Sequence, residues 1–188
     1  MTYISDQEFH NIDYRKVPLE RGDYEGCLFS HCNLTELYLN GFRFIDCEFT
    51  NCDLSSAKLR DSSWQDTRFK GCKMLGLLFE QSDRFGLRLD FDHCILEHSS
   101  FFELDMAKTR FENCKLTGVD FTRTNLSEAI FNNCDLLDAV FDHTNLKGCD
   151  LRTADHYRID PEQNKMNGAR VSIPGLNGIL GKYGISIE

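Results

Sequence analysis

Sulfur and imidazole side chains are the first candidates for chemistry in this 188-residue chain, which has 9 cysteines and 6 histidines. His31 and His93 each stand directly before a cysteine. Closely spaced thiolates and imidazoles bind Zn²⁺, and paired cysteines in an oxidising compartment form disulfides. Six of the cysteines recur at steps of 20 residues, with one step of 22: Cys32, Cys52, Cys72, Cys94, Cys114 and Cys134. What they do therefore depends on the repeat that positions them.

That repeat has a period of five residues. Every fifth residue from Tyr24 to Phe79 is large and apolar, and after a slip of two residues the series resumes from Phe91 to Leu151. A second, smaller series lies two positions before the first and includes all 9 cysteines. Neither a helix nor an ordinary strand has a period of five. The pattern predicts a chain that turns a corner every five residues, with two side chains per segment pointing inward.

Four such segments close a square coil of 20 residues. Residue types agree with this period, because one column of the coil consists of phenylalanine alone: Phe29, Phe49, Phe69, Phe91, Phe111 and Phe131. Coils of this kind stack like parallel strands, about 4.8 Å apart. The sequence therefore predicts an all-β fold, a quadrilateral parallel β-helix.

The column arrangement argues against chemistry at the cysteines. Parallel side chains stacked in register are poorly oriented for disulfides. A cysteine pointing inward and the preceding histidine pointing outward cannot bind one metal ion together. We expect free, buried thiols that only pack, with His31 and His93 as turn residues. A filled β-helix also offers no pocket for convergent groups, so the sequence predicts no enzyme, no catalytic or metal site and no cofactor.

The five-residue frame also predicts the organisation of the chain. Residues 22–154 form the β-helix, residues 1–21 form an N-terminal cap or first coil, and residues 155–188 form a C-terminal capping and dimerisation module. Seven residues stand where five should at 82–88, which predicts a two-residue bulge. We expect Phe85 to fill the missing inward position and Gly86 to permit the turn. The bulge is either a tolerated insertion or a contact loop made by Asp83, Arg84 and Phe85.

The last residues are apolar at helical spacing after Pro174, and then alternate like an edge strand at Ile185 and Ile187. They either plug the open end of the β-helix or join two molecules end to end. We predict a homodimer through this segment, with the interface made by Ile173, Leu176, Ile179, Leu180, Tyr183, Ile185 and Ile187.

The units CNLTE, CDLSS, CKLTG, CDLLD, AVFDH and TNLKG resemble the repeats of the pentapeptide-repeat family over nearly the whole chain. The tail NGARVSIPGLNGILGKYGISIE resembles the C-terminal module of the bacterial Qnr, MfpA and McbG group. This resemblance implies a right-handed quadrilateral β-helix, tail-to-tail dimers and protection of DNA gyrase by imitation of duplex DNA. Qnr proteins have larger loops, so this chain is nearer the MfpA pattern.

The charge distribution bears on that implication. The net charge of −9 disfavours direct nucleic-acid binding, which needs cationic surface. Residues 90–154 have 12 acidic and 6 basic side chains. DNA of the length of the repeat region, about 31 Å, would carry about 18 charges, whereas residues 22–154 carry a net −8. The chain can match DNA only if its acids gather on one or two faces. The candidates are Asp90, Asp92, Glu97, Glu103, Asp105, Glu112, Asp120, Glu128, Asp135, Asp138, Asp142 and Asp150.

The leading functional hypothesis is a DNA-mimicking protein that binds DNA gyrase or another type II topoisomerase and gives resistance or immunity to quinolones or peptide toxins. The alternative is a scaffold for another protein partner, which mixed-charge faces would favour. No apolar run is long enough to span a membrane, and the N-terminus does not resemble a signal peptide. We therefore expect a cytoplasmic protein.

Overall fold

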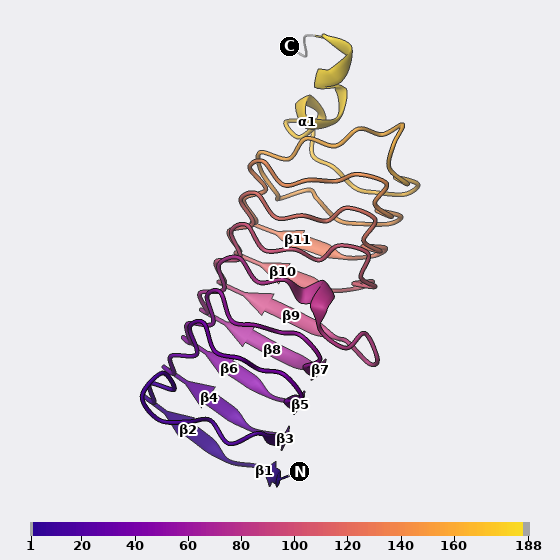
Figure 1. The fold of residues 1–188 in the computed structure, drawn as a ribbon. Coiled ribbons are helices and arrows are strands. Elements are labelled where there is room, and N and C mark those ends of the chain that lie inside the picture. The colour runs from indigo at the N-terminus through magenta and orange to yellow at the C-terminus, as the bar shows by residue number, and fades with distance from the viewer. Residues whose placement is uncertain (1, 186–188) are drawn as a thin grey trace.

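The structure, a computed structural model that describes residues 2–185, is a parallel β-solenoid followed by a short C-terminal helix (Figure 1). Neighbouring coils pair in parallel at a spacing of 20 residues, as Phe29 does with Phe49. The predicted quadrilateral parallel β-helix is confirmed.

Two of the four sides are regular sheets. The four-stranded face has the order β1-β3-β5-β7, and the seven-stranded face has the order β11-β10-β9-β8-β6-β4-β2. The strands are β1 (Thr2–Ser5), β2 (Glu8–His10), β3 (Gly22–Glu25), β4 (Leu28–Ser30), β5 (Arg43–Ile45), β6 (Glu48–Thr50), β7 (Ser63–Gln65), β8 (Thr67–Lys70), β9 (Leu89–Asp92), β10 (Arg110–Glu112) and β11 (Ile130–Asn132). Because β1 and β2 pair with β3 and β4, residues 2–10 belong to the first coil.

The other two sides are held by isolated bridges. We call them the Leu54 face, which includes the bridge Asp53↔Lys73, and the Phe101 face, which includes Ser100↔Asp120. The four-stranded face continues beyond β7 in the same way, through Asp105↔Asn125.

The core is a stack of apolar rungs. Phe111 is completely buried, and its ring centroid lies 5.1 Å from that of Phe91 and 4.8 Å from that of Phe131, in parallel stacks. Rings of the neighbouring Phe101 column meet it edge-on, at 6.0 Å for Phe101 itself. Both geometries are favourable for aromatic pairs. The coil repeat thus converts a five-residue sequence pattern into one continuous aromatic core.

Most corners have a left-handed backbone at the residue two positions after the large inward side chain; Gln81 and Thr153 are exceptions. His31 and His93 have φ values of 55° and 53°, and the asparagines of the same column have values of 52° to 54°. Asparagine and histidine enter this region more readily than most residues. The prediction that His31 and His93 are turn residues is confirmed.

The register between coils changes from 20 to 22 residues within the 82–88 segment. Ser63 pairs with Asp83, but Thr67 pairs with Leu89. The sequence prediction that Phe85 fills the missing inward position is wrong, because its side chain is 78% exposed. Leu87 packs against the core instead. Gly86 has a φ of 67°, so it makes the turn that carries Phe85 outward.

The C-terminal segment forms the predicted short helix, α1 (Leu176–Leu180), which runs on into the 3₁₀ turn Gly181–Tyr183. A further 3₁₀ turn, Phe79–Gln81, precedes the bulge. Ile185 lies outside any strand, so the expected edge strand does not include it, and Ile187 lies outside the described residues.

Candidate partner-binding surface

The cysteines are part of the core. All nine are buried and free. In the main column, every thiol except that of Cys114 donates a weak hydrogen bond to a carbonyl oxygen of the preceding coil, as Cys72 does to Phe49 at 3.2 Å. Burial raises the pKa of Cys47 and Cys149 to about 12. Thiols that stay protonated are poor nucleophiles and metal ligands. Among residues 2–185, no group of three or more metal-ligating side chains is arranged around a common point.

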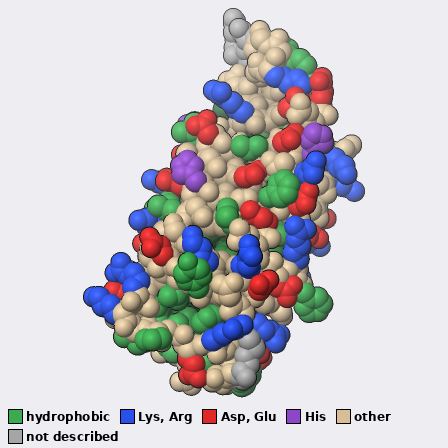
Figure 2. All heavy atoms as spheres, viewed as in Figure 1, with side chains coloured by type: hydrophobic (Ala, Val, Ile, Leu, Met, Phe, Trp, Pro, Cys, Tyr) green, Lys and Arg blue, Asp and Glu red, His purple; other side chains and the backbone are tan. Residues whose placement is uncertain are grey.

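The predicted acidic residues do not lie together. The seven-stranded face carries Asp90, Asp92, Glu112 and Asp150; the Leu54 face and its corner carry Glu97, Asp135 and Asp138; the Phe101 face and its corner carry Glu103, Asp120 and Asp142; and the four-stranded face carries Asp105 and Glu128. With the basic residues of the same segment counted, the first three faces each have a net charge of −2 and the fourth is neutral. Figure 2 shows the resulting mixture of acidic and basic side chains on one view of the rod.

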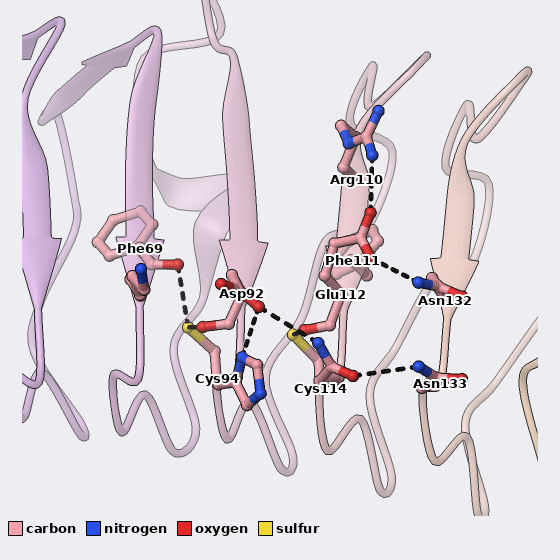
Figure 3. A network of polar contacts seen from close by, with 12 residues as sticks. Phe69, Asp92, Cys94, Arg110, Phe111, Glu112, Cys114, Asn132 and Asn133 are labelled. Atoms are coloured by element: carbon pink, nitrogen blue, oxygen red, sulfur yellow. Dashed lines mark hydrogen bonds and ion pairs between the residues drawn. The ribbon is translucent and has the colours of Figure 1, made fainter.

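Many of these acids are also paired. Glu112 accepts a hydrogen bond from Arg110 at 2.8 Å and another from Asn132 at 2.7 Å (Figure 3). Asp92 lies 2.6 Å from His93. Ion pairs between coils bind Glu103 to Arg123, at 3.0 Å. Acidic and basic side chains are therefore interspersed and paired over this surface, in contrast to the uninterrupted line of phosphates on DNA.

Asp150 is the most strongly held of the predicted acids. Its carboxylate lies 2.8 Å from Arg152 and 3.0 Å from Arg170, and its side chain is only 13% exposed. The hydrogen bond from Arg152 lowers the pKa of Asp150. This residue ties the last coils together, so its geometry indicates a structural role on the seven-stranded face.

The bulge presents an exposed aromatic side chain on a hydrogen-bonded turn. The Phe85 backbone N–H donates to the Asp83 carboxylate at 3.0 Å, which closes the turn. The returning strand bonds to the β-helix through the Arg88 N–H and the Trp64 carbonyl, at 3.2 Å. Phe85 is therefore presented to solvent on a segment anchored at both ends, with Arg84 beside it in the sequence. Such an aromatic side chain loses little entropy when a partner covers it.

Within the C-terminal module, the helix is docked onto residues 159–162, which belong to the last coil. Lys182 binds both Asp160 and Glu162, the latter at 2.9 Å, and the Tyr183 hydroxyl donates to Glu162 at 2.8 Å. The Ile159 N–H donates to the Gly178 carbonyl at 2.9 Å. The helix is held to the coil by these polar contacts, and its apolar side chains are only partly covered.

The predicted dimer residues divide into two groups. Ile173, Tyr183 and Ile185 are 78%, 46% and 55% exposed. Leu176, Ile179 and Leu180 are half-buried, and Ile179 packs against the core. Ile187 lies outside the described residues. The exposed group is the part of the module that a second molecule would cover.

The pattern of the chain is that of a known family. Residues 87–155 match the model of the pentapeptide repeat region, and residues 27–63 match the model of pentapeptide repeats in eight copies. This chain belongs to the pentapeptide-repeat family. No curated protein matches its sequence.

Solved structures similar to this pentapeptide-repeat chain include three of QnrB1, a plasmid-mediated fluoroquinolone resistance protein. One trypsin-treated variant has a TM-score of 0.75 at 18% identity, covering 100% of this chain and 92% of that one. A second trypsin-treated variant gives 0.66 at 16% identity, with 100% of both chains covered. Full-length QnrB1 gives 0.56 at 14% identity, covering 98% of this chain and 100% of that one. At these identities the likeness shows the fold.

Sequence reasoning missed two exposed apolar residues that lie beside the C-terminal helix of this pentapeptide-repeat protein. Leu137 and Val140 are 45% and 47% exposed, and they lie on the last coils, next to the docked helix. Val140 lines a hollow of about 720 Å³ together with Ile179 and Lys182. Both residues could have been found from the five-residue frame, because they occupy outward positions that are usually polar. In the described part of the chain, no helix is long and apolar enough to cross a membrane.

Proposed function

We propose that this protein is a non-catalytic binding protein of the cytoplasm that contacts DNA gyrase or another type II topoisomerase and gives resistance or immunity to poisons such as quinolones or peptide toxins. The supporting observation is the likeness to QnrB1, a fluoroquinolone resistance protein, which extends over the whole chain at a TM-score of 0.75. A core filled with phenylalanine, leucine and cysteine leaves the outer surface as the part that can act.

The mode of contact in this proposal differs from simple DNA mimicry. Three faces share the net acidity of residues 90–154 equally, and many acids are already bound to arginine or histidine. Charge of this kind gives specificity and speeds association more than it supplies affinity. We propose that the shape of the rod and the Asp83–Arg84–Phe85 contact loop contribute the main contacts, and that those acidic residues that lie on the face toward the partner add polar contacts around them.

A second candidate function is a scaffold for another protein partner. The mixed-charge faces favour it, because they carry no property specific to a DNA-binding enzyme. This candidate keeps the same contact surfaces, the loop tip and the outward side chains, and changes only the partner.

Gyrase supercoiling separates the two candidates. Purified protein at micromolar concentration should preserve supercoiling in the presence of a quinolone or a peptide toxin. Phe85→Ala should weaken that protection by about tenfold, because an exposed aromatic anchor contributes about 1–2 kcal/mol to binding. Tyr38→Ala is the matched control, since Tyr38 is a 74% exposed aromatic side chain on the Phe101 face. Absence of any effect of the wild-type protein at micromolar concentration would refute the topoisomerase proposal and leave the scaffold.

We further propose that the C-terminal module joins two molecules end to end. The exposed Ile173, Tyr183 and Ile185 support this contact, and so do the exposed Leu137 and Val140 next to the helix. Leu180→Asp should halve the mass measured by sedimentation, whereas Val17→Asp, at an exposed apolar position near the other end of the rod, should not. An unchanged mass for Leu180→Asp would mean that the module only caps the β-helix.

A further inference from the structure

The outward side chains of the seven-stranded face have a regular order of charge along the rod. The first outward residue of strands β4, β6, β8, β9, β10 and β11 is, in turn, apolar, acidic, basic, acidic, basic and apolar. These residues are Leu28, Glu48, Arg68, Asp90, Arg110 and Ile130, and they stack in parallel register. Within residues 2–185, no other column of the coil alternates in sign over four consecutive coils.

When the same column is read in the opposite direction along the rod, each acidic residue falls opposite a basic one and each apolar residue opposite an apolar one. If a second copy is rotated by 180° about an axis that runs along the strands, between β8 and β9, the two sheets face each other with the rods antiparallel. Arg68 then faces Asp90 of the second copy, and Glu48 faces Arg110. At the outer positions Leu28 faces Ile130. Each contact occurs twice, because a two-fold interface is isologous.

A second column leads to the same arrangement independently. The outward residues on the other side of each phenylalanine are Ser30, Thr50, Lys70, Asp92, Glu112 and Asn132. Under the same rotation Lys70 faces Asp92 of the second copy, Thr50 faces Glu112, and Ser30 faces Asn132. Across these six strands, neither column places two like charges opposite each other, so the two columns agree on one axis. Outside them, at the ends of the face, Glu8 lies opposite Asp150 of the second copy, so the attractive contact is confined to the six central strands.

The face also has room for such contacts. A shallow hollow of about 540 Å³ lies between the two columns at Phe69 and Phe91. It is lined by basic and by acidic side chains: Arg68, Lys70 and Arg110, and Glu48, Asp90, Asp92 and Glu112. Long basic side chains of a second copy can enter this hollow. Glu112 already accepts hydrogen bonds from Arg110 and Asn132 (Figure 3), so it is oriented before a partner arrives.

We propose that the seven-stranded face is a self-association surface, through which two copies pack side by side in antiparallel orientation. The contact spans six strands, about 29 Å along the rod, which places it in the range of weak interfaces. Its charged groups are largely exposed, and Arg68 also lies 3.8 Å from Asp46 of its own chain. The association is therefore weak and sensitive to salt. It is separate from the end-to-end contact, and together the two would link rods into larger assemblies.

Charge exchange at Arg68 and Asp90 tests this surface on the full-length chain. Sedimentation velocity of the wild type should show an association that is lost when the salt concentration rises from about 25 mM to about 500 mM. Arg68→Glu alone and Asp90→Arg alone should each weaken it by about tenfold or more, because symmetry turns two attractive contacts into two repulsive ones. The double variant R68E/D90R should restore it. An equimolar mixture of the two single variants should also associate, as a heterodimer.

The controls separate this contact from the others. Arg60→Glu makes the same charge change on the Phe101 face and should leave the association unchanged. Leu180→Asp should leave the salt-dependent step in place, whatever it does to the end-to-end contact. The proposal fails if the wild type shows no salt-dependent association, if Arg68→Glu behaves like Arg60→Glu, or if neither the double variant nor the mixture recovers it.

Discussion

The aromatic core permits a quantitative test of how the solenoid is stabilised. Phe111 is 0% exposed and stands in the middle of the phenylalanine column, with two parallel stacks and two edge contacts to Phe101 and Phe121. Truncation of a buried phenylalanine to alanine costs about 3–5 kcal/mol. Because aromatic pairs add to simple burial, we expect Phe111→Ala to lower the free energy of unfolding by about 4–5 kcal/mol.

The same truncation at the end of the column is the matched control. Phe9 is only partly buried, stacks on Phe29 at 4.7 Å and meets Tyr24 edge-on at 5.9 Å. With one neighbour in the column in place of two, Phe9→Ala should cost about 1–2 kcal/mol. Repeat proteins are stabilised by contacts between adjacent repeats. The decrease in the free energy of unfolding should therefore be larger in the middle of the column than at its end.

Guanidinium unfolding followed by two signals provides the assay. Circular dichroism reports on the whole solenoid, whereas the fluorescence of Trp64, the single tryptophan, reports on the coils around β7. The two transitions should coincide in the wild type and separate in Phe111→Ala, because the cavity weakens the coupling between the two halves. Equal losses for Phe111→Ala and Phe9→Ala, or a loss below about 1 kcal/mol for Phe111→Ala, would refute this account of the core.

Three further predictions concern the helix, the thiols and Asp150. Gly178→Ala should release the C-terminal module in hydrogen exchange, because a Cβ there would lie 2.1 Å from the Tyr157 carbonyl, whereas Gly181→Ala, with no atom within 4 Å, should not. Native thiols should resist a disulfide reagent at pH 8 and react after unfolding. Since burial raises the pKa of Cys47 and Cys149 to about 12, stability should be complete below about pH 9 and fall as the pH rises towards 12. Asp150→Asn should lower the free energy of unfolding at pH 7 by about 1–2 kcal/mol. Arg152 lowers the pKa of Asp150 in the folded protein. The difference in stability between wild type and variant should therefore shrink as the pH falls below about 4.

The fold could be predicted because the same types of inward residue recur in every coil. A single apolar residue at position five means little, but the phenylalanine and cysteine columns keep one register through the two-residue slip. The structure buries both columns as expected. Propensity arguments were less useful, since segments of three or four residues are too short for a strand pattern to be recognised.

The bulge could not be predicted because its outcome depends on competing local interactions. Phe85 and Leu87 are both apolar and both lie near the vacant inward position. The Asp83 carboxylate accepts the Phe85 N–H, and Gly86 takes a left-handed conformation, so the turn places Phe85 outside and Leu87 against the core. A sequence pattern with a period of five contains no information about a turn that interrupts it.

The surface shows why net charge was a poor guide to function. Net negative charge is concentrated in residues 90–154, yet a coil distributes consecutive residues over four faces and brings residues 20 apart into contact. The ion pairs Asp23–Arg43, Asp53–Lys73 and Glu103–Arg123 all have this separation. They can be found by writing the sequence in rows of 20 and reading down the columns, as the cysteines were found. The same procedure reveals the alternating column from Glu48 to Arg110. In a solenoid, therefore, the spacing that defines the core also defines which surface charges are neighbours, and a hypothesis about a binding face should be derived from columns.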